Sequence, residues 1–162
     1  MWRKLNIKTI LKAMRFWPPY LGAGIKVSSI SEDLSEIEVQ MKLTPLNSNY
    51  VGVHFGGSLY SMCDPFFMFM LLHHLKQDHI VWDQAAEIEF VKPGRGTVTA
   101  HFKMPLDRVE EIKEEALEQF SVKPVFQCEV TDENGETVAR MKKYLYVRRK
   151  DAKERFKSKP LE

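Results

Sequence analysis

The sequence predicts an α+β domain in which a curved antiparallel sheet wraps one long apolar helix. Six segments alternate apolar with polar residues at a period of two, and they occur in pairs separated by short turn sequences, as in antiparallel hairpins. Residues 49–75 (NYVGVHFGGSLYSMCDPFFMFMLLHHL) form a run that is apolar on almost every helical face. Such a helix must be enclosed, and the apolar face of an antiparallel sheet encloses it most economically.

The chain begins with a predicted amphipathic, basic helix. Residues 1–31 contain no Asp or Glu, and Pro18 and Pro19 end the helical pattern because proline cannot continue a helix. Basic residues recur between apolar ones along this segment: Arg3, Lys4, Lys8, Lys12 and Arg15 between Leu5, Ile10, Leu11 and Met14. We interpret the helix as docking on the rest of the domain; contact with a membrane surface and an organellar transit segment are the alternatives.

The six alternating segments form three predicted hairpins. Their apolar positions face one way and their polar positions the other, which is the pattern of strands that are buried on one side. The pairs are residues 23–30 with 37–43 around SEDLS, 86–90 with 98–104 around KPGRG, and 126–130 with 139–147 around DENG. Together they predict one antiparallel sheet.

A short acidic helix is predicted between the second and third hairpins, where it covers the sheet. Asp107 is its candidate N-cap. Its apolar face carries Leu106, Val109, Ile112 and Ala116. From Arg148 onward the chain is charged and poor in apolar residues, so we predict a single domain over residues 1–150 and a charged, solvated tail over residues 151–162.

Composition excludes several classes of function. With 162 residues, 44% of them hydrophobic and 28% charged, the chain fits one globular domain, and a net charge of +2 is too small to indicate a nucleic-acid partner. Cys63 and Cys128 lack metal-ligand spacing, so we expect neither a disulfide framework nor a zinc site, and a cytoplasmic location. His73, His74 and His79 match no metal-binding motif, so no metal is expected.

Asp64 is the one carboxylate in the apolar run. Gly56 and Gly57 stand where the helix begins and can offer backbone N–H groups to a carbonyl or an oxyanion. Asp64 follows Gly57 by seven residues, which returns it to nearly the same face but roughly 10 Å further along the axis. We therefore expect Asp64 of one chain to meet the glycines of a second chain across a two-fold axis, where it attacks an acyl carbonyl or activates water.

Two simpler interpretations of this segment stay open. Asp64 followed by Pro65 is a favoured N-cap and N1 pair, so Asp64 caps a second helix after a kink, a role that is compatible with catalysis. A membrane span needs about 20 apolar residues. Asp64, Pro65, the glycine pair and His54 count against a span.

The run also carries a family motif. Its members are Asn49, Gly52, Gly56, Gly57 and Asp64. Their order and spacing resemble the motif of hotdog-fold acyl-CoA thioesterases of the phenylacetate-pathway (PaaI-like) type. The sequences FGGSLY and DP in the run, the WDQA of residues 82–85 and the KPGRG of residues 92–96 further resemble a poorly characterised branch of hotdog domains. The resemblance covers nearly the whole chain and implies a long helix wrapped by a curved sheet, in dimers and often tetramers.

The resemblance also implies roles for individual residues. A glycine at the helix N-terminus, Gly56 or Gly57, polarises the thioester carbonyl, Asp64 of the partner chain is the base or nucleophile, and Asn49 orients the site. The histidine that usually precedes the glycine pair is replaced by Phe55, with His54 one position earlier.

The sequence-based conclusion is an acyl thioester hydrolase acting on coenzyme A or acyl-carrier-protein thioesters, with coenzyme A as part of the substrate and no separate cofactor. Candidate substrate-binding residues are His54, Phe55, Lys92 and Arg95; the two basic residues could meet coenzyme A phosphates, although a basic turn more often serves solubility. The stripe of residues 66–70 (FFMFM) is more often core than an acyl tunnel. The alternative function is a hotdog domain that binds an acyl or lipid-like ligand without turnover, or serves only as an oligomeric scaffold.

Overall fold

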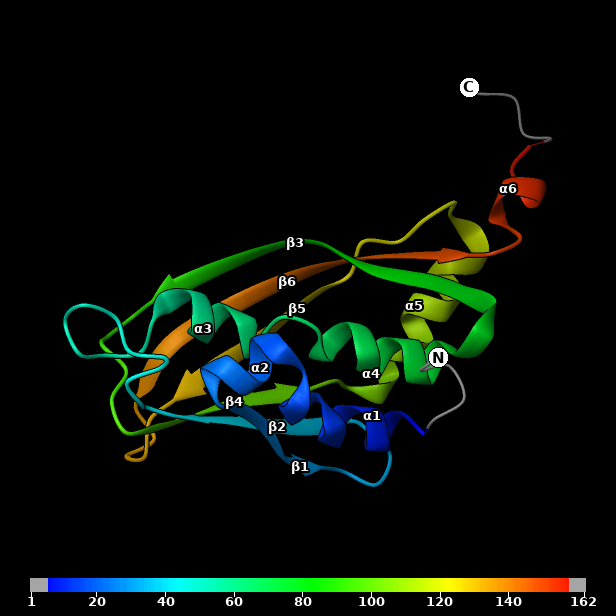
Figure 1. Cartoon of the computed structure of the whole chain (residues 1–162). Helices are drawn as coiled ribbons and strands as arrows, with labels where there is room; N and C mark the ends of the chain where they lie inside the picture. Colours follow the sequence, from blue (N-terminus) through cyan, green and yellow to red (C-terminus); the bar gives the residue numbers. More distant parts are fainter. Residues whose placement is uncertain (1–5, 158–162) are drawn as a thin grey trace.

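The structure, a computed structural model, describes residues 6–157 and contains the predicted sheet and central helix (Figure 1). The strands are β1 (Ile25–Ile30), β2 (Glu36–Lys42), β3 (His79–Phe90), β4 (Thr97–Lys103), β5 (Val125–Thr131) and β6 (Thr137–Arg149). The helices are α1 (Ile7–Ala13), α2 (Pro18–Ala23), α3 (Gly56–Ser61), α4 (Phe66–Leu75), α5 (Leu106–Glu118) and α6 (Ala152–Arg155), with the 3-10 turns η2 (Met14–Phe16) and η3 (Lys76–Asp78).

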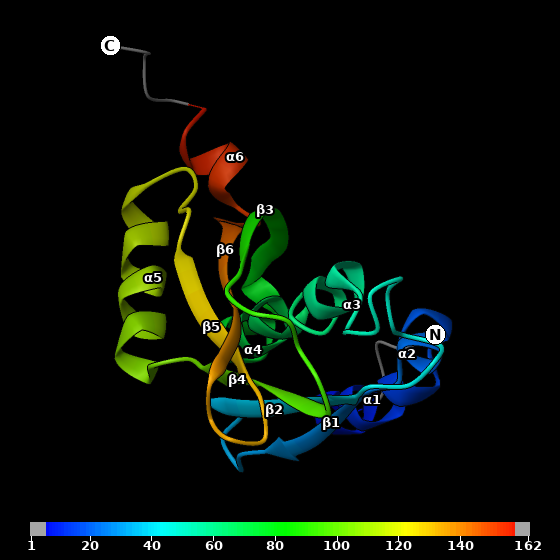
Figure 2. The ribbon, with the colours of Figure 1, turned by 90° about the vertical axis from the view of Figure 1, so that its left-hand side faces the viewer.

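The sheet has the strand order β1-β2-β4-β5-β6-β3, and every neighbouring pair is antiparallel. Figure 2 shows how it curls around α3 and α4, with α1 and α2 on the open side. The predicted curved antiparallel sheet around a central helix is thereby confirmed.

Two of the three predicted hairpins are confirmed, β1 with β2 and β5 with β6. The predicted hairpin of β3 with β4 is wrong, because β3 pairs with β6 and β4 lies between β2 and β5. The segment between them crosses the end of the sheet instead of turning tightly. Its backbone is held by hydrogen bonds from Leu43 N to Gly96 O (2.8 Å) and from His54 N to Gly94 O (3.0 Å).

The central helix is interrupted as predicted, but the predicted cap is wrong. α3 ends at Ser61 and α4 begins at Phe66, with Pro65 as its N-cap residue and no side-chain cap. The Asp64 carboxylate accepts hydrogen bonds from the side chains of Tyr60 and Lys143. A charge-assisted hydrogen bond to a buried ammonium is stronger than a bond to a backbone N–H, so this pairing overrides the local capping preference.

The apolar stripe of α4 is divided between core and surface. Phe66 and Phe67 are fully buried and pack on Phe102 of β4, with ring centroids 4.9 and 5.2 Å away. Met68 and Phe69 are partly buried at the edge of this cluster. The interpretation of the stripe as core therefore holds for its inward side.

The N-terminal segment packs on the domain, as predicted for a docking helix. Leu11 and Tyr20 are buried in the common core. α1 ends at Ala13, and Pro18 opens α2 because proline is tolerated in the first turn of a helix. Residues 1–5, which include the predicted basic positions 3 and 4, lie outside the described residues.

Three of the four residues of the predicted face of α5, Val109, Ile112 and Ala116, lie in the core. The prediction is wrong for Leu106, the first residue of the helix, which is exposed. The predicted N-cap is wrong, since Pro105 precedes the helix and Asp107 lies in its first turn. Within residues 6–157, the Asp107 carboxylate accepts a hydrogen bond only from the next backbone N–H, that of Arg108, because the helix has already begun at Leu106.

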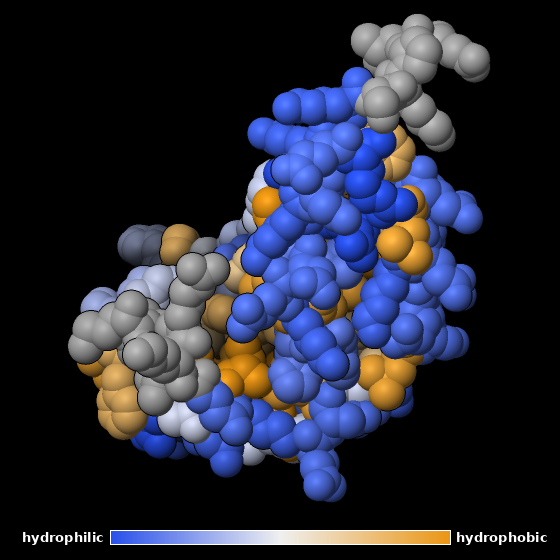
Figure 3. Space-filling view, turned by 90° about the vertical axis from the view of Figure 1, so that its right-hand side faces the viewer, coloured by the Kyte–Doolittle hydropathy of each residue, from blue (hydrophilic) through white to orange (hydrophobic). Residues whose placement is uncertain are grey.

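The described part of the predicted tail, residues 151–157, contains the short helix α6, and residues 158–162 lie outside the described residues. Arg149 pairs with Asp151 at 2.9 Å, α6 follows, and Ala152 is buried. The face around α6 is nonetheless strongly hydrophilic (Figure 3). Within residues 6–157, no helix is long and apolar enough to cross a membrane.

Candidate active site

Asp64 lies in an ionic cluster that the sequence interpretation did not foresee. Lys143 Nζ lies 2.6 Å from Asp64 Oδ1 and 3.3 Å from Asp83 Oδ2. The Tyr60 hydroxyl donates a hydrogen bond to the same Asp64 oxygen at 3.0 Å. One chain therefore fixes the Asp64 side chain with two donors.

The fold explains how these side chains meet. Lys143 lies on the inward face of β6, in phase with the apolar positions Ala139, Met141, Leu145 and Val147, and its side chain is only 1% exposed. Asp83 lies where a bulge shifts the register of β3 against β6. Tyr60 precedes Asp64 by four residues, about one helical turn.

Lys143 carries its charge. Burial of the ammonium opposes ionisation, but the hydrogen bond to Asp64 and the charges of Asp64 and Asp83 outweigh burial and raise the pKa of Lys143. Burial raises the pKa of Asp83, and the negative charge of Asp64 raises it further. The positive charge of Lys143 lowers this pKa but does not cancel the effect of burial. Burial and the adjacent Asp64 likewise raise the pKa of the Tyr60 hydroxyl, which therefore stays a protonated donor.

The second oxygen of Asp64 is available for chemistry. Within residues 6–157, Oδ2 accepts no hydrogen bond, and the side chain is 43% exposed. A carboxylate that is fixed through one oxygen and open at the other can take a proton from water or attack a carbonyl carbon.

Gly56 and Gly57 begin α3 as predicted. Within residues 6–157 neither backbone N–H donates a hydrogen bond, since the first bonds of the helix come from Ser58 and Leu59 to Phe55 O. A Cβ atom at Gly56 would lie 3.0 Å from the Phe90 ring, and one at Gly57 would lie 2.4 Å from the Phe55 ring. Both positions therefore accommodate an aromatic neighbour, and Phe55 lies directly at the glycine end of the helix.

The side chain of Asn49 stabilises the loop of residues 49–53 through hydrogen bonds to its backbone. Its side-chain oxygen accepts hydrogen bonds from Val51 N (3.1 Å) and Val53 N (3.2 Å), and Gly52 supplies the left-handed residue of that loop at φ +76°. Among the described residues it has no contact with Asp64, so its orienting role stays a prediction.

His54 is buried and holds the loop of residues 92–96. One ring nitrogen, Nε2, lies 3.2 Å from Gly96 O, while Nδ1 is buried without a partner among the described residues. Burial lowers the pKa of His54, and the hydrogen bond to the carbonyl of Gly96 raises it by a smaller amount. Nothing in this geometry directs the ring toward Asp64.

We expect the free energy of unfolding to fall as the pH drops below about 6.5, the ordinary histidine pKa. Because the folded-state pKa of His54 is lowered, the unfolded chain binds more protons in this range, and stability is lost until the folded-state pKa is passed. One histidine can give a slope of at most about 1.4 kcal/mol per pH unit. Urea denaturation at pH 7.5, 6.5 and 5.5 measures it. His54→Gln should remove this component, while His101→Gln, at an exposed histidine, should retain it.

The two basic candidates differ. Lys92 lies 2.6 Å from Asp132 Oδ2 and also pairs with Glu136, and hydrogen bonds to these carboxylates raise its pKa. Arg95 is exposed, and within residues 6–157 it makes no ion pair. Arg95 is therefore the freer of the two for a phosphate, and a contact of either residue with substrate stays a prediction.

Two alternative chemistries gain no support from the geometry. Cys63 and Cys128 are buried free thiols that lie close together in the core. The hydrogen bond to Cys128 and, second, burial raise the pKa of Cys63. A raised pKa opposes the use of this thiol as a nucleophile, because the thiolate is the reactive form. Among residues 6–157, no cluster of His, Cys, Asp or Glu is arranged to hold a metal ion.

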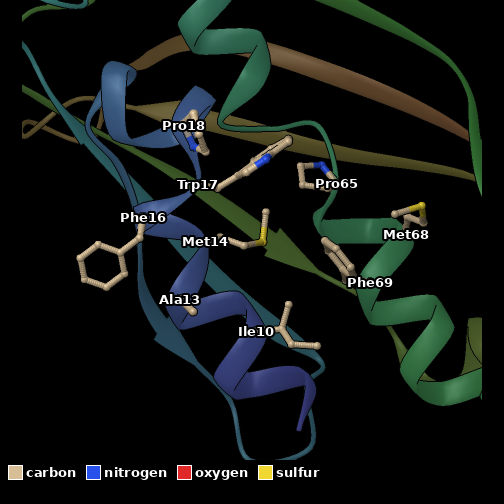
Figure 4. A pocket seen from close by; sticks show the side chains of 9 residues that line it. All are labelled: Ile10, Ala13, Met14, Phe16, Trp17, Pro18, Pro65, Met68 and Phe69. Carbon is tan, nitrogen blue, oxygen red and sulfur yellow. The ribbon is translucent and has the colours of Figure 1, made fainter. Parts of the chain in front are cut away.

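An apolar cavity of about 610 Å³ lies between the N-terminal segment and α4 (Figure 4). Its lining residues are Ile10, Ala13, Met14, Phe16, Trp17, Pro18, Pro65, Met68 and Phe69. Its lining residue Pro65 directly follows Asp64 in the chain, although no member of the ionic cluster lines the cavity itself. The sequence interpretation considered only the α4 side of such a tunnel; the acid-free apolar positions of the first helix supply the other side.

The chain matches a known protein family over most of its length. A family model described as "Domain of unknown function (DUF4442)" matches residues 8–147. The chain belongs to this family. No curated protein matches it.

Solved structures with the same fold include proteins described as thioesterases. The protein of unknown function PA5026 from Pseudomonas aeruginosa, described as a probable thioesterase, is 17% identical with a TM-score of 0.77, over 90% of this chain and 97% of that one. Thioesterase HI1161 from Haemophilus influenzae is 15% identical with a TM-score of 0.64, over 91% and 93%. The Escherichia coli PaaI protein from the phenylacetic acid degradation operon is 20% identical with a TM-score of 0.56, over 90% and 96%. These matches confirm the hotdog fold.

Proposed function

We propose that this DUF4442 chain hydrolyses acyl thioesters of coenzyme A or acyl carrier protein, with Asp64 as the general base or nucleophile. The observation that carries the proposal is the state of Asp64: Lys143 and Tyr60 hold one oxygen, while the other accepts no hydrogen bond within residues 6–157 and belongs to a side chain that is 43% exposed. A structural ion pair alone would not need a carboxylate that is exposed to this extent. The thioesterase descriptions of neighbours with the same fold support this choice of reaction.

The complete site is proposed to need two chains. α3 runs from Gly56 to Ser61, about 9 Å at 1.5 Å per residue, and Asp64 lies beyond its C-terminal end, so the backbone N–H groups that would hold the oxyanion would belong to a partner's helix. In the same site Asn49 would orient the substrate, and Phe55 and Arg95 would line its entrance.

The free edge of β3 is the proposed contact between the two chains. β3 is the last strand of the sheet and is 12 residues long, so it offers a row of backbone groups for pairing with a second copy. We expect size-exclusion chromatography with light scattering to give at least twice the mass of one chain at micromolar concentration. A monomer that is nevertheless active would contradict the two-chain site.

The proposal is tested by thiol release from a panel of thioesters. Acetyl, butyryl, octanoyl, dodecanoyl, hexadecanoyl and phenylacetyl esters of coenzyme A, and acyl carrier protein loaded with the best of these groups, are each mixed with purified protein. Turnover of at least one ester at 1 s⁻¹ or faster, the low end of ordinary enzymes, is expected. No turnover above the buffer rate for any ester would exclude hydrolysis of these substrates.

A second function, binding without turnover, is favoured by one observation. Phe55 replaces the usual histidine, and its ring, with that of Phe90, lies against the glycines that would hold the oxyanion. A chain that binds a non-hydrolysable S-alkyl coenzyme A by calorimetry, but releases no thiol from the matching ester, would be such a binding domain. A cytoplasmic location stays a prediction under either function.

A further inference from the structure

The apolar cavity beside Pro65 has the features of a small-molecule site. Its volume of about 610 Å³ lies within the roughly 300–1,000 Å³ that ligand pockets usually have. Among the lining side chains that the structure describes, the indole N–H of Trp17 is the one strong hydrogen-bond donor, and none is charged. The cavity is open to solvent on one side, so only the part of a ligand that lies against these walls must be apolar, because a polar group there would lose its water bonds without replacement.

The walls come from two elements that can adapt to a flexible guest. In Figure 4 the side chains of Trp17 and Met14 from the N-terminal segment point toward Pro65 and Phe69 across the space, whereas Phe16 points away from it. Met14 and Met68 have unbranched, flexible side chains that can follow a chain of variable conformation. This lining suits a straight alkyl chain better than a rigid polar ring.

The cavity is joined to the ionic cluster by two routes. Along the backbone, its wall residue Pro65 follows Asp64 directly. Through packing, the Trp17 ring lies 5.4 Å from Tyr20, whose hydroxyl donates a hydrogen bond to Ser61 O at 2.9 Å. Burial and the charge of Asp64 both raise the pKa of Tyr20, in agreement with this proximity. The side of the cavity formed by Pro65 is therefore the one nearest in the chain to Asp64.

We propose that this cavity receives the straight alkyl chain of a medium- to long-chain acyl thioester, with the thioester end beside Asp64. A methylene takes about the 30 Å³ that a water molecule takes in the liquid, so a chain of roughly ten to fourteen carbons fills a little over half of the space and leaves the mouth open. The N-terminal segment is then a wall of the substrate site rather than only a docking helix. This inference rests on the proposed hydrolysis and names its substrate class.

The test compares kcat/KM for straight acyl-coenzyme A esters of 4, 8, 12 and 16 carbons with the value for phenylacetyl-coenzyme A. Each methylene buried in the cavity should raise kcat/KM two- to fourfold, so the ester of 12 carbons should exceed that of 4 carbons by at least 100-fold. Ala13→Phe, which fills the cavity, should flatten the series. Thr9→Phe adds the same group to an exposed position of α1 outside the cavity and should leave the series unchanged.

A second variant protects the test against misfolding of Ala13→Phe. Met14→Ala enlarges the cavity and should move the preferred chain length upward by about two carbons, since one methionine side chain occupies about as much space as three methylenes. Circular dichroism and thermal melts of all variants show that the fold is retained.

Three results would overturn the inference: a flat series in the unmodified protein, a preference for the phenylacetyl ester, or an equal loss at all lengths in Ala13→Phe. Conversion of an oligomer to a monomer by Ala13→Phe would assign the cavity to a second copy of the chain and overturn it as well. If no ester is hydrolysed, calorimetry with S-alkyl coenzyme A thioethers of the same lengths separates the two proposals. Affinity that rises with length and is lost in Ala13→Phe would keep the cavity assignment while the hydrolysis proposal fails; affinity without length dependence would remove both.

Discussion

Asp64→Asn is expected to lower kcat at least 100-fold while the protein stays folded. Asparagine has the same shape, and its oxygen can still accept the hydrogen bonds from Lys143 and Tyr60 that fix the side chain. It can neither take a proton from water nor attack a carbonyl, and losing a general base typically costs 10²- to 10⁴-fold in rate. Thiol release from the best ester, with KM measured separately, detects the change.

The matched control for this substitution is Asp151→Asn. Asp151 is also an ion-paired carboxylate, 2.9 Å from Arg149, but it lies beyond β6 and outside the cavity lining. It should change kcat by less than twofold. An Asp64→Asn protein that keeps a third or more of the wild-type kcat would remove Asp64 from the chemistry and leave it as a structural partner of Lys143.

Asp64 should contribute less to stability than to activity. Its side chain is 43% exposed, so solvent screens its attraction to Lys143, and Asp83 still faces the ammonium when Asp64 is neutral. We expect Asp64→Asn to lower the free energy of unfolding by about 1 kcal/mol or less. A large loss of activity with a small loss of stability is the pattern of a functional group.

The faces of the strands could be predicted from sequence, but not all of their neighbours. Alternation at a period of two shows which side chains point inward, and the segments around residues 37–43 and 98–104 became β2 and β4 with small shifts. The same alternation says nothing about which strands pair. Residues 86–90 therefore looked like the hairpin partner of β4, although they pair with β6.

One residue of the candidate site could be predicted from the sequence, and its main partner could not. Asp64 could be predicted because one carboxylate in an apolar run is unusual, and its position is a local property of the sequence. Its partner could not, because Lys143 is 79 residues away and the contact depends on how β6 crosses the central helix. The available signal was a lysine in phase with Met141 and Leu145, at a position where the strand pattern requires an inward side chain.

Lys143→Met is expected to lower the free energy of unfolding by about 2–4 kcal/mol. Removing one member of a buried ion pair leaves the other charge without compensation, which usually costs 3–5 kcal/mol, and the exposure of Asp64 reduces this figure. Asp83 is the charge left behind, and its Oδ1 is already buried without a hydrogen bond among the described residues. Urea denaturation at pH 7.5 measures the loss, and kcat should fall with it because Asp64 loses its closer anchor.

Lys142→Met is the matched control, since Lys142 is adjacent on β6 but exposed on the opposite face; it should change stability by less than about 0.5 kcal/mol. Adding Asp83→Asn to Lys143→Met removes the stranded charge and should recover at least half of the loss, a coupling that a simple packing defect would not show.

The pH dependence of the stability lost in Lys143→Met distinguishes a charge effect from a packing effect. Burial raises the pKa of Asp83 and Lys143 lowers it, so this pKa rises further when Lys143 is removed, and the folded variant binds more protons than the folded unmodified protein as the pH falls. The deficit of Lys143→Met should therefore shrink between pH 7.5 and pH 5, and a deficit that stays constant would mean that Lys143 acts through packing of its alkyl stem rather than through its charge.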